Sequence, residues 1–132
     1  MKLDAVATYA KTLAGVKVGK RWGKRTWLVG EHGFVWERPL GKADLERYGD
    51  ETPPSGDIIG IVVENLDAKD ALLAMELPGF FTIPHFNGYA AVLVELRKAR
   101  APHVRAAIKD AWSVVSERPA KRPKKPKRKA SR

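Results

Sequence analysis

The sequence contains no cysteine among its 132 residues, which excludes disulfide bonds, thiolate zinc sites, iron–sulfur clusters and a cysteine nucleophile. Long apolar runs are also lacking, because the longest, Ile58–Val63 and Tyr89–Val94, fall far short of the roughly 20 residues that cross a bilayer. Met1–Asp4 carries an early acid with no apolar segment behind it, so a secretory signal is not expected. With a hydrophobic content of 44%, these absences predict a folded, cytoplasmic protein of one domain that does not enter a membrane.

Acidic residues are absent from the segment 118–132, although it holds nine Lys or Arg residues. Residues 1–117 hold 16 basic and 15 acidic residues, so this segment carries nearly all of the net charge of +10. Its three prolines and its few apolar residues predict a disordered tail beside a folded domain of residues 1–117. The cations of the tail are candidate phosphate contacts: Arg118, Lys121, Arg122, Lys124, Lys125, Lys127, Arg128, Lys129 and Arg132.

A second group of cations lies within the expected domain. Its members are Lys17, Lys20, Arg21, Lys24 and Arg25. We expect Gly23 to turn the chain between two strands, which places Lys17 and Arg21 on one side of the first strand and Lys20 on the other. Such a hairpin can reach phosphate groups. The alternative is that Trp22 and Trp27 anchor the sheet to the helices and the cations form only a solvated sheet edge. The sequence leaves these two interpretations open.

Hydrophobic spacing along residues 1–117 predicts helices and strands in alternation. Helices are expected over 3–14, 43–48, 68–76 and 102–117, and strands over 16–22, 25–29, 34–38, 58–63 and 89–96. Asp67 is placed to cap the third helix, and 80–88 is expected to be irregular. The strand 58–63 is apolar on both faces, which is typical of the centre of a sheet. This order predicts an α+β fold in which an antiparallel sheet packs against N-terminal, middle and C-terminal helices.

Two motifs carry a resemblance to a known family. With Arg21-Trp22-Gly23-Lys24 near its start and Pro84-His85-Phe86-Asn87-Gly88 later on, most of 1–117 resembles the MmcQ/YjbR family. The resemblance implies a frataxin-like fold and DNA binding through paired β-hairpin wings. The chain departs from the family pattern at Arg25, where members often carry proline, and at Tyr89, near which they often place a tryptophan. The basic tail is not part of the family core.

No metal or cofactor is expected. Frataxin-like proteins that bind iron use an acidic first helix, and the first helix of this chain offers only Asp4. The three histidines, His32, His85 and His103, are widely separated and lack the spacing of metal ligands.

The motif around His85 is the best candidate for a pocket, formed by Trp22, His85, Phe86 and Tyr89. A histidine there can act as an acid or a base near neutral pH, but no partner for a nucleophile–base pair is evident. We therefore expect the His85 ring to bond to the backbone and brace its turn. Phe80, Phe81 and Phe86 are expected in the core.

These features together predict a non-enzymatic DNA-binding protein of the nucleoid, taken as a monomer, for which RNA is the other nucleic-acid partner considered. Weak sequence preference is expected, because no helix presents the Arg, Asn and Gln side chains that read base edges. One alternative is a module that binds a small apolar molecule or a protein near Phe86 and Tyr89, with the tail only localising it. A second alternative is an enzyme that uses His85.

Overall fold

The computed structural model describes residues 1–21 and 23–119, and it confirms the α+β class. The elements in chain order are α1 (Leu3–Lys11), β1 (Val16–Arg21), β2 (Lys24–Val29), β3 (His32–Glu37), α2 (Lys42–Glu46), β4 (Ile58–Val62), α3 (Leu66–Ala74), β5 (Phe80–Phe81), the 3-10 turn η1 (Pro84–Phe86), β6 (Ala91–Glu95) and α4 (Ala101–Ser116). None of the described helices is long and apolar enough to cross a membrane.

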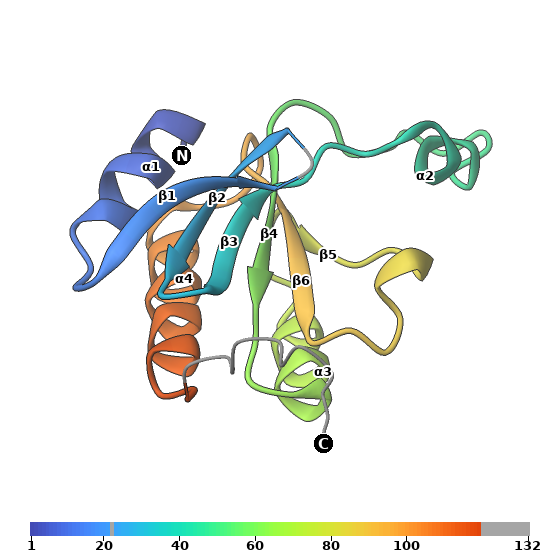
Figure 1. Ribbon diagram of the computed structural model, residues 1–132. Helices are drawn as coiled ribbons and strands as arrows, with labels where there is room; N and C mark the ends of the chain where they lie inside the picture. The colour runs from blue at the N-terminus through green and yellow to red at the C-terminus, as the bar shows by residue number, and fades with distance from the viewer. Residues whose placement is uncertain (22, 120–132) are drawn as a thin grey trace, which may run out of the picture.

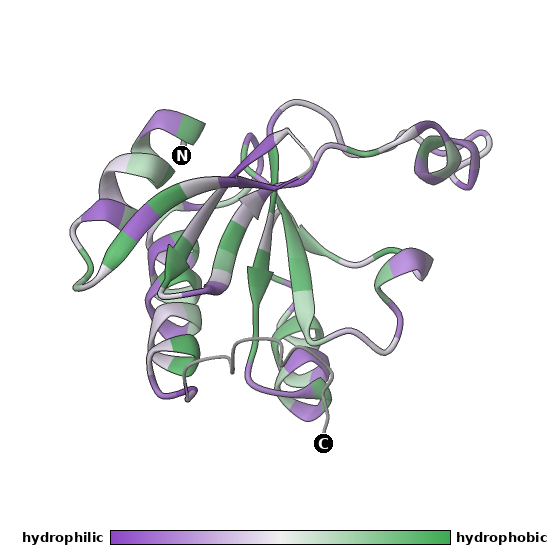
Figure 2. Ribbon diagram, in the orientation of Figure 1, coloured by the Kyte–Doolittle hydropathy of each residue, from purple (hydrophilic) through white to green (hydrophobic). Residues whose placement is uncertain are grey.

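The six strands form one sheet in the order β1-β2-β3-β4-β6-β5, and every neighbouring pair is antiparallel (Figure 1). All five residues of β4 are buried, as its two-sided apolar pattern predicts. Figure 2 shows the same contrast by hydropathy, since β4 and all of β6 before its last residue, Glu95, lack hydrophilic residues, whereas β1 alternates with them. The polar edge of the sheet is therefore the β1–β2 hairpin.

One face of the sheet holds the larger core and is covered by helices. Val6 of α1 and Ile108 of α4 are buried there against Ile59 and Val94 of the central strands, and leucines of α3 pack at the border. Trp27 of β2 is fully buried in the same core. The helices thus pack against one face of β2 and β3 and leave the opposite face of these strands uncovered by helices.

The opposite face of the sheet is covered by the segment between β5 and β6. Ile83 and Phe86 of this segment are buried against Ile58 and Leu93 in a second, smaller cluster. The cover reaches β4 and β6, while the same face of β1, β2 and β3 borders a cleft. Phe86 is in the core as expected, whereas Phe80 and Phe81 are only half-buried.

Two local predictions are wrong. Asn65, and not Asp67, caps α3, because the Asn65 side chain accepts a hydrogen bond of 2.8 Å from the backbone N–H of Ala68. The segment 80–88 is not wholly irregular, since it contains β5, which pairs with β6, and the turn η1. Both features, the exact start of a helix and the pairing of a two-residue strand, depend on three-dimensional contacts that the local sequence pattern does not specify. The predicted disorder of 118–132 falls almost wholly outside the described residues.

Candidate functional site

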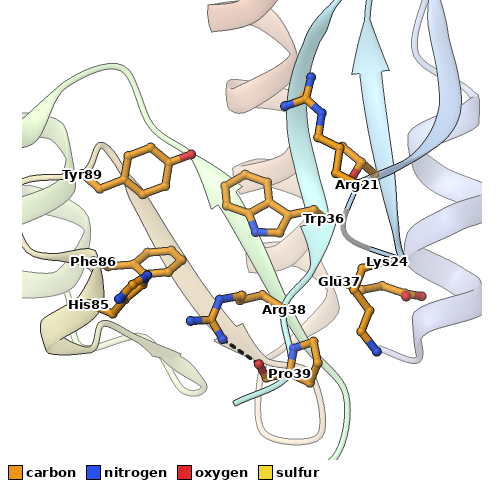
Figure 3. A pocket seen from close by; sticks show the side chains of 11 residues that line it. Arg21, Lys24, Trp36, Glu37, Arg38, Pro39, His85, Phe86 and Tyr89 are labelled. Atoms are coloured by element: carbon orange, nitrogen blue, oxygen red, sulfur yellow. Dashed lines mark hydrogen bonds between the residues drawn. The ribbon is translucent and has the colours of Figure 1, made fainter. Parts of the chain in front are cut away.

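A cleft of 670 Å³ lies on the face of the sheet opposite the helices. The β1–β2 hairpin borders one side of it, and the segment that joins β5 to β6 borders the other (Figure 3). Eleven residues line it: Arg21, Lys24, Thr26, Gly33, Trp36, Glu37, Arg38, Pro39, His85, Phe86 and Tyr89. In Figure 3 the Trp36 side chain lies between the two borders. The cleft thus combines aromatic and cationic side chains from distant parts of the sequence.

The floor of the cleft is the indole of Trp36, which rests on Gly60. The two residues are cross-strand partners of β3 and β4. A Cβ added at Gly60 would lie 2.5 to 2.8 Å from three indole atoms, Cε2, Cζ2 and Nε1. Three such similar distances mean that one face of the ring covers the Gly60 backbone. The ring therefore lies flat on the sheet, and its other face is turned toward the cleft.

Two further aromatic rings stand beside Trp36. The centroid of the Tyr89 ring is 6.3 Å from that of Trp36 and 5.4 Å from that of Phe86. Tyr89 is 49% exposed, whereas Phe86 is buried. Tyr89 is therefore the aromatic side chain of this border that a ligand can reach most easily.

Lys69 of α3 holds the segment that carries these rings. Its ammonium group donates hydrogen bonds of 2.6 Å to the carbonyl of Phe86 and of 2.8 Å to the carbonyl of Tyr89. Burial lowers the pKa of Lys69 below its ordinary 10.5, and the nearby Asp70 carboxylate only partly opposes this. Lys69 is thus a buried clamp that fixes the backbone on both sides of the loop Asn87-Gly88.

Sequence reasoning missed Lys69 and assigned the bracing role to His85. The structure corrects this prediction, because the His85 side chain is exposed and makes none of the hydrogen bonds found among the described residues. The available signal was spacing: Lys69 precedes Leu72 and Leu73 by three and four residues, which places a lysine at the position of a buried residue on the helix.

Arg38 extends across one end of the cleft and is held by Asp44. The Arg38 guanidinium lies 5.5 Å from the Phe86 ring centroid, and its Nη1 lies 3.3 Å from Asp44 Oδ2. The Asp44 carboxylate also accepts a 3.0 Å hydrogen bond from the backbone N–H of Gly41. Burial alone would raise the pKa of Asp44, but the Gly41 bond and the Arg38 charge outweigh it and hold that pKa below its ordinary 3.8.

The five predicted hairpin cations divide between the two faces of the sheet. Arg21 and Lys24 are cross-strand partners, and both line the cleft. Alternation along β1 puts Lys17 on the same face as Arg21 and puts Lys20 on the helix-covered face, as the sequence predicts. Arg25 is the cross-strand partner of Lys20 and is bonded to Glu37, with 2.7 Å between Arg25 Nε and Glu37 Oε2. Arg25 is therefore the least available of the five.

The last described residues are linked to the cleft indirectly, through a short chain of contacts. The Pro119 carbonyl oxygen lies 3.0 Å from Nε2 of His32, the first residue of β3. The preceding residue, Glu31, accepts a 2.8 Å hydrogen bond from the Arg21 guanidinium through its backbone carbonyl. The base of the basic tail is thus next to the turn that Arg21 contacts.

Apart from Lys17, Lys20 and Arg25, which lie on the hairpin and do not line the cleft, the predicted site residues fall into three groups. His85, Phe86 and Tyr89 line one cleft together with Arg21 and Lys24, so two sites that the sequence treats separately meet. Arg118 is exposed just past the end of α4. Outside the described residues lie Trp22, Lys121, Arg122, Lys124, Lys125, Lys127, Arg128, Lys129 and Arg132. Within 1–21 and 23–119, no group of three His, Asp or Glu side chains is placed to hold a metal ion.

Comparison with known proteins identifies three relatives. Over 106 residues the chain is 42% identical to Uncharacterized protein Mb2600 of Mycobacterium bovis and to Uncharacterized proteins MT2646 and Rv2570 of Mycobacterium tuberculosis. The aligned region covers 78% of this chain and 81% of each relative. No family model matches the chain, and no solved structure matches it.

Proposed function

We propose that this chain, which belongs to the same family as the three mycobacterial proteins, is a non-enzymatic protein that binds DNA mainly through its phosphates. The observation that carries the proposal is the division of charge. Residues 118–132 hold nine cations and no acid, while the remaining 117 residues are nearly neutral. Cations on such a segment neutralise phosphates and release counterions, which gives affinity without sequence selection. In this proposal the protein acts in the cytoplasm, on the nucleoid.

The folded domain adds a second contact surface, the cleft-facing side of the β1–β2 hairpin. Lys17, Arg21 and Lys24 are exposed on this side, and the tail begins near the turn that Arg21 contacts. Arg25 and Lys20 contribute less, because Arg25 is paired with Glu37 and Lys20 faces the other side. The resemblance to the MmcQ/YjbR family supports the same assignment, since both motifs that carry it supply residues to the cleft.

The test is the salt dependence of duplex DNA binding by the full chain and two variants. The first variant replaces the eight Lys and Arg residues after Pro119 with Gln, and the second carries Lys17→Gln, Arg21→Gln and Lys24→Gln. If every tail cation engages, the slope of log K against log salt loses about 7 in the first variant and about 3 in the second. A control with Lys11→Gln, Lys98→Gln and Lys109→Gln removes equal charge from exposed positions outside the cleft lining.

Failure of the full chain to bind duplex DNA even at low salt would refute the proposal. If the control variant loses as much salt dependence as the hairpin variant, the hairpin is not a specific part of the DNA-contact surface, because net charge alone would then explain the effect.

The cleft itself supports a second candidate function, a module that binds a small molecule. Its volume of 670 Å³ is in the range of ordinary ligand pockets, and its lining joins aromatic rings with a few polar groups. In that case a specific compound should raise the Tm of the first variant, in which the tail cations after Pro119 are replaced with Gln, whereas DNA should leave the Tm of this variant unchanged.

A further inference from the structure

We propose that the cleft binds one unpaired base of a single-stranded nucleic acid, with the base stacked in front of Trp36 and Tyr89 and its flanking phosphates at Arg21 and Lys24. This inference rests on the proposed function and deepens it, because it names a single strand as the partner of the folded domain. It goes beyond the phosphate contacts of the tail, which do not distinguish single strands from duplexes.

The aromatic floor is built to present a flat face. Gly60 removes the side chain that would separate Trp36 from the sheet, so the indole is supported from below and open above. Tyr89 stands beside it and is half exposed. Bases stack on such rings whatever their sequence, because every base has a π-face. A planar, apolar ligand with polar edges is therefore the chemistry that this floor recognises.

The position of the rings is fixed before any ligand arrives. The two hydrogen bonds from Lys69 hold the carbonyls of Phe86 and Tyr89, which flank the exposed loop. Phe86 packs edge-on against Tyr89 from the core side. A site that is ordered in advance loses less conformational entropy when it binds.

The charges of the cleft favour an anion beside the rings. Glu37 is the acidic side chain among the lining residues, and its carboxylate is bonded to Arg25. The charge of Arg38 is likewise matched by Asp44. Arg21 and Lys24 have no such carboxylate partner among the described residues, and they stand across the cleft from Tyr89 (Figure 3). The net field is thus positive where a phosphate next to a stacked base would lie.

Only an unpaired base can reach this floor. In a duplex each base is stacked on both faces and paired at its edge, so it would have to leave the helix at a cost of a few kcal/mol. The cleft lies between the hairpin and the β5–β6 segment, a position that a single strand can enter.

A strand fits the site better than a free nucleotide because cations continue beyond the cleft. Lys17 lies further along the same face of β1, and Pro119, near the start of the tail, lies beside the turn contacted by Arg21. Successive phosphates of one strand can follow this path, whereas a single nucleotide uses only its first part.

The experiment compares four probes on the full chain: oligothymidylate, an abasic oligomer of equal length, a duplex of equal length and thymidine monophosphate. The abasic oligomer keeps the phosphates and lacks the bases, so the ratio of the two single-strand affinities isolates stacking. We expect oligothymidylate to bind about 5- to 150-fold more tightly than the abasic oligomer, the range that stacking of one base provides.

Two tyrosine variants locate the effect. Tyr89→Phe keeps the ring and should keep the ratio, whereas Tyr89→Leu keeps apolar bulk without the ring and should lower the ratio, with Trp36 providing the stacking that remains. The double variant Arg21→Gln, Lys24→Gln should bind both single strands more weakly than the matched double variant Lys11→Gln, Lys109→Gln does. Because Tyr89, Arg21 and Lys24 are exposed, these variants should fold, and their thermal unfolding verifies it.

The outcomes separate the inference from the function on which it rests. If the duplex binds but oligothymidylate and the abasic oligomer bind equally, the inference is wrong and DNA binding by the tail stands. An unchanged ratio in Tyr89→Leu also overturns it. If thymidine monophosphate binds as tightly as oligothymidylate, the cleft is a nucleotide pocket and the strand is excluded. If no polynucleotide binds at low salt, the proposed function fails as well.

Discussion

Asp44 is the buried carboxylate that holds Arg38 at the end of the cleft. It accepts the Gly41 N–H and lies close to both Arg38 and Arg47. Its pKa is held below 3.8 in the folded chain, so the unfolded chain takes up a proton first as the pH falls. The stabilisation by Asp44 is therefore fully present above pH 3.8 and is lost as the pH falls through the lower folded value.

The variant Asp44→Asn should show this pH dependence as a difference in unfolding free energy from the original chain that decreases as the pH falls. At neutral pH it should be less stable than the original chain, because the amide replaces the charge that pairs with Arg38. As the pH falls through the lowered pKa of Asp44, the protonated carboxyl comes to resemble the amide, so the two unfolding free energies should converge. Urea unfolding across this pH range measures the gap. Asp50→Asn, at an exposed position, serves as the control, and a gap that stays constant with pH would contradict the account.

At the scale of elements, α3 is tied to the β5–β6 segment by Lys69. Among the described residues Lys69 is the one buried cation, at 6% exposure, and its two hydrogen bonds end on carbonyls 17 and 20 residues further along the chain. Lys69→Met keeps much of the stem and removes the donor, which leaves both carbonyls without this partner. We expect a loss of about 1–3 kcal/mol in the free energy of unfolding, the usual effect of leaving buried hydrogen-bonding groups unpaired.

Chemical denaturation measures this loss, and Lys109→Met provides the matched control. Lys109 is exposed on α4, so its replacement should change stability by no more than about 0.5 kcal/mol. Lys69→Met should also weaken the binding of oligothymidylate relative to that of the abasic oligomer, because the loop that carries Tyr89 loses the two hydrogen bonds from Lys69. Equal stability of Lys69→Met and the original chain would mean that burying the ammonium group costs as much as its two bonds contribute.

The same elements show how far sequence determines structure here. Strand β4, helix α4 and the hairpin follow from local periodicity, which is why they were predictable. Strand β5 has only two residues and exists because Phe80 and Phe81 pair with β6, a contact that no local pattern encodes. The burial of Lys69 likewise depends on which segment packs over α3.

The candidate site was predictable as residues but not as a site. His85, Phe86 and Tyr89 lie more than 60 residues from Arg21 in sequence. The sheet order places β2, β3 and β4 between β1, which carries Arg21, and β6, which follows Tyr89. Trp36 and Arg38 were missed because they lie in and just after an ordinary strand pattern. Their role becomes visible through Gly60, whose missing side chain matters only once β3 and β4 are known to pair.

At the scale of the whole molecule, the two proposed contact regions differ in how they couple binding to folding. A ligand raises Tm only to the extent that it binds the folded chain more tightly than the unfolded chain. The cations of 118–132 are present in both states, and the sequence predicts no part for them in the core. The cleft exists only when Trp36, Tyr89 and Arg21 are brought together by the sheet.

Duplex DNA and oligothymidylate should therefore bind the full chain and yet shift its Tm differently. At 100 times its Kd, a ligand of the folded state alone adds about 2.7 kcal/mol, which raises Tm on the order of 10 °C for a domain of this size. Oligothymidylate should raise Tm by nearly this amount. The duplex and the abasic oligomer, each also at 100 times its own Kd, should raise Tm less, because only their contacts with the hairpin depend on the folded state. Scanning calorimetry of the full chain measures all three. A duplex that stabilises the chain as much as oligothymidylate would show that the folded surface, and not the tail, carries duplex binding, because contacts available to the unfolded chain cannot raise Tm.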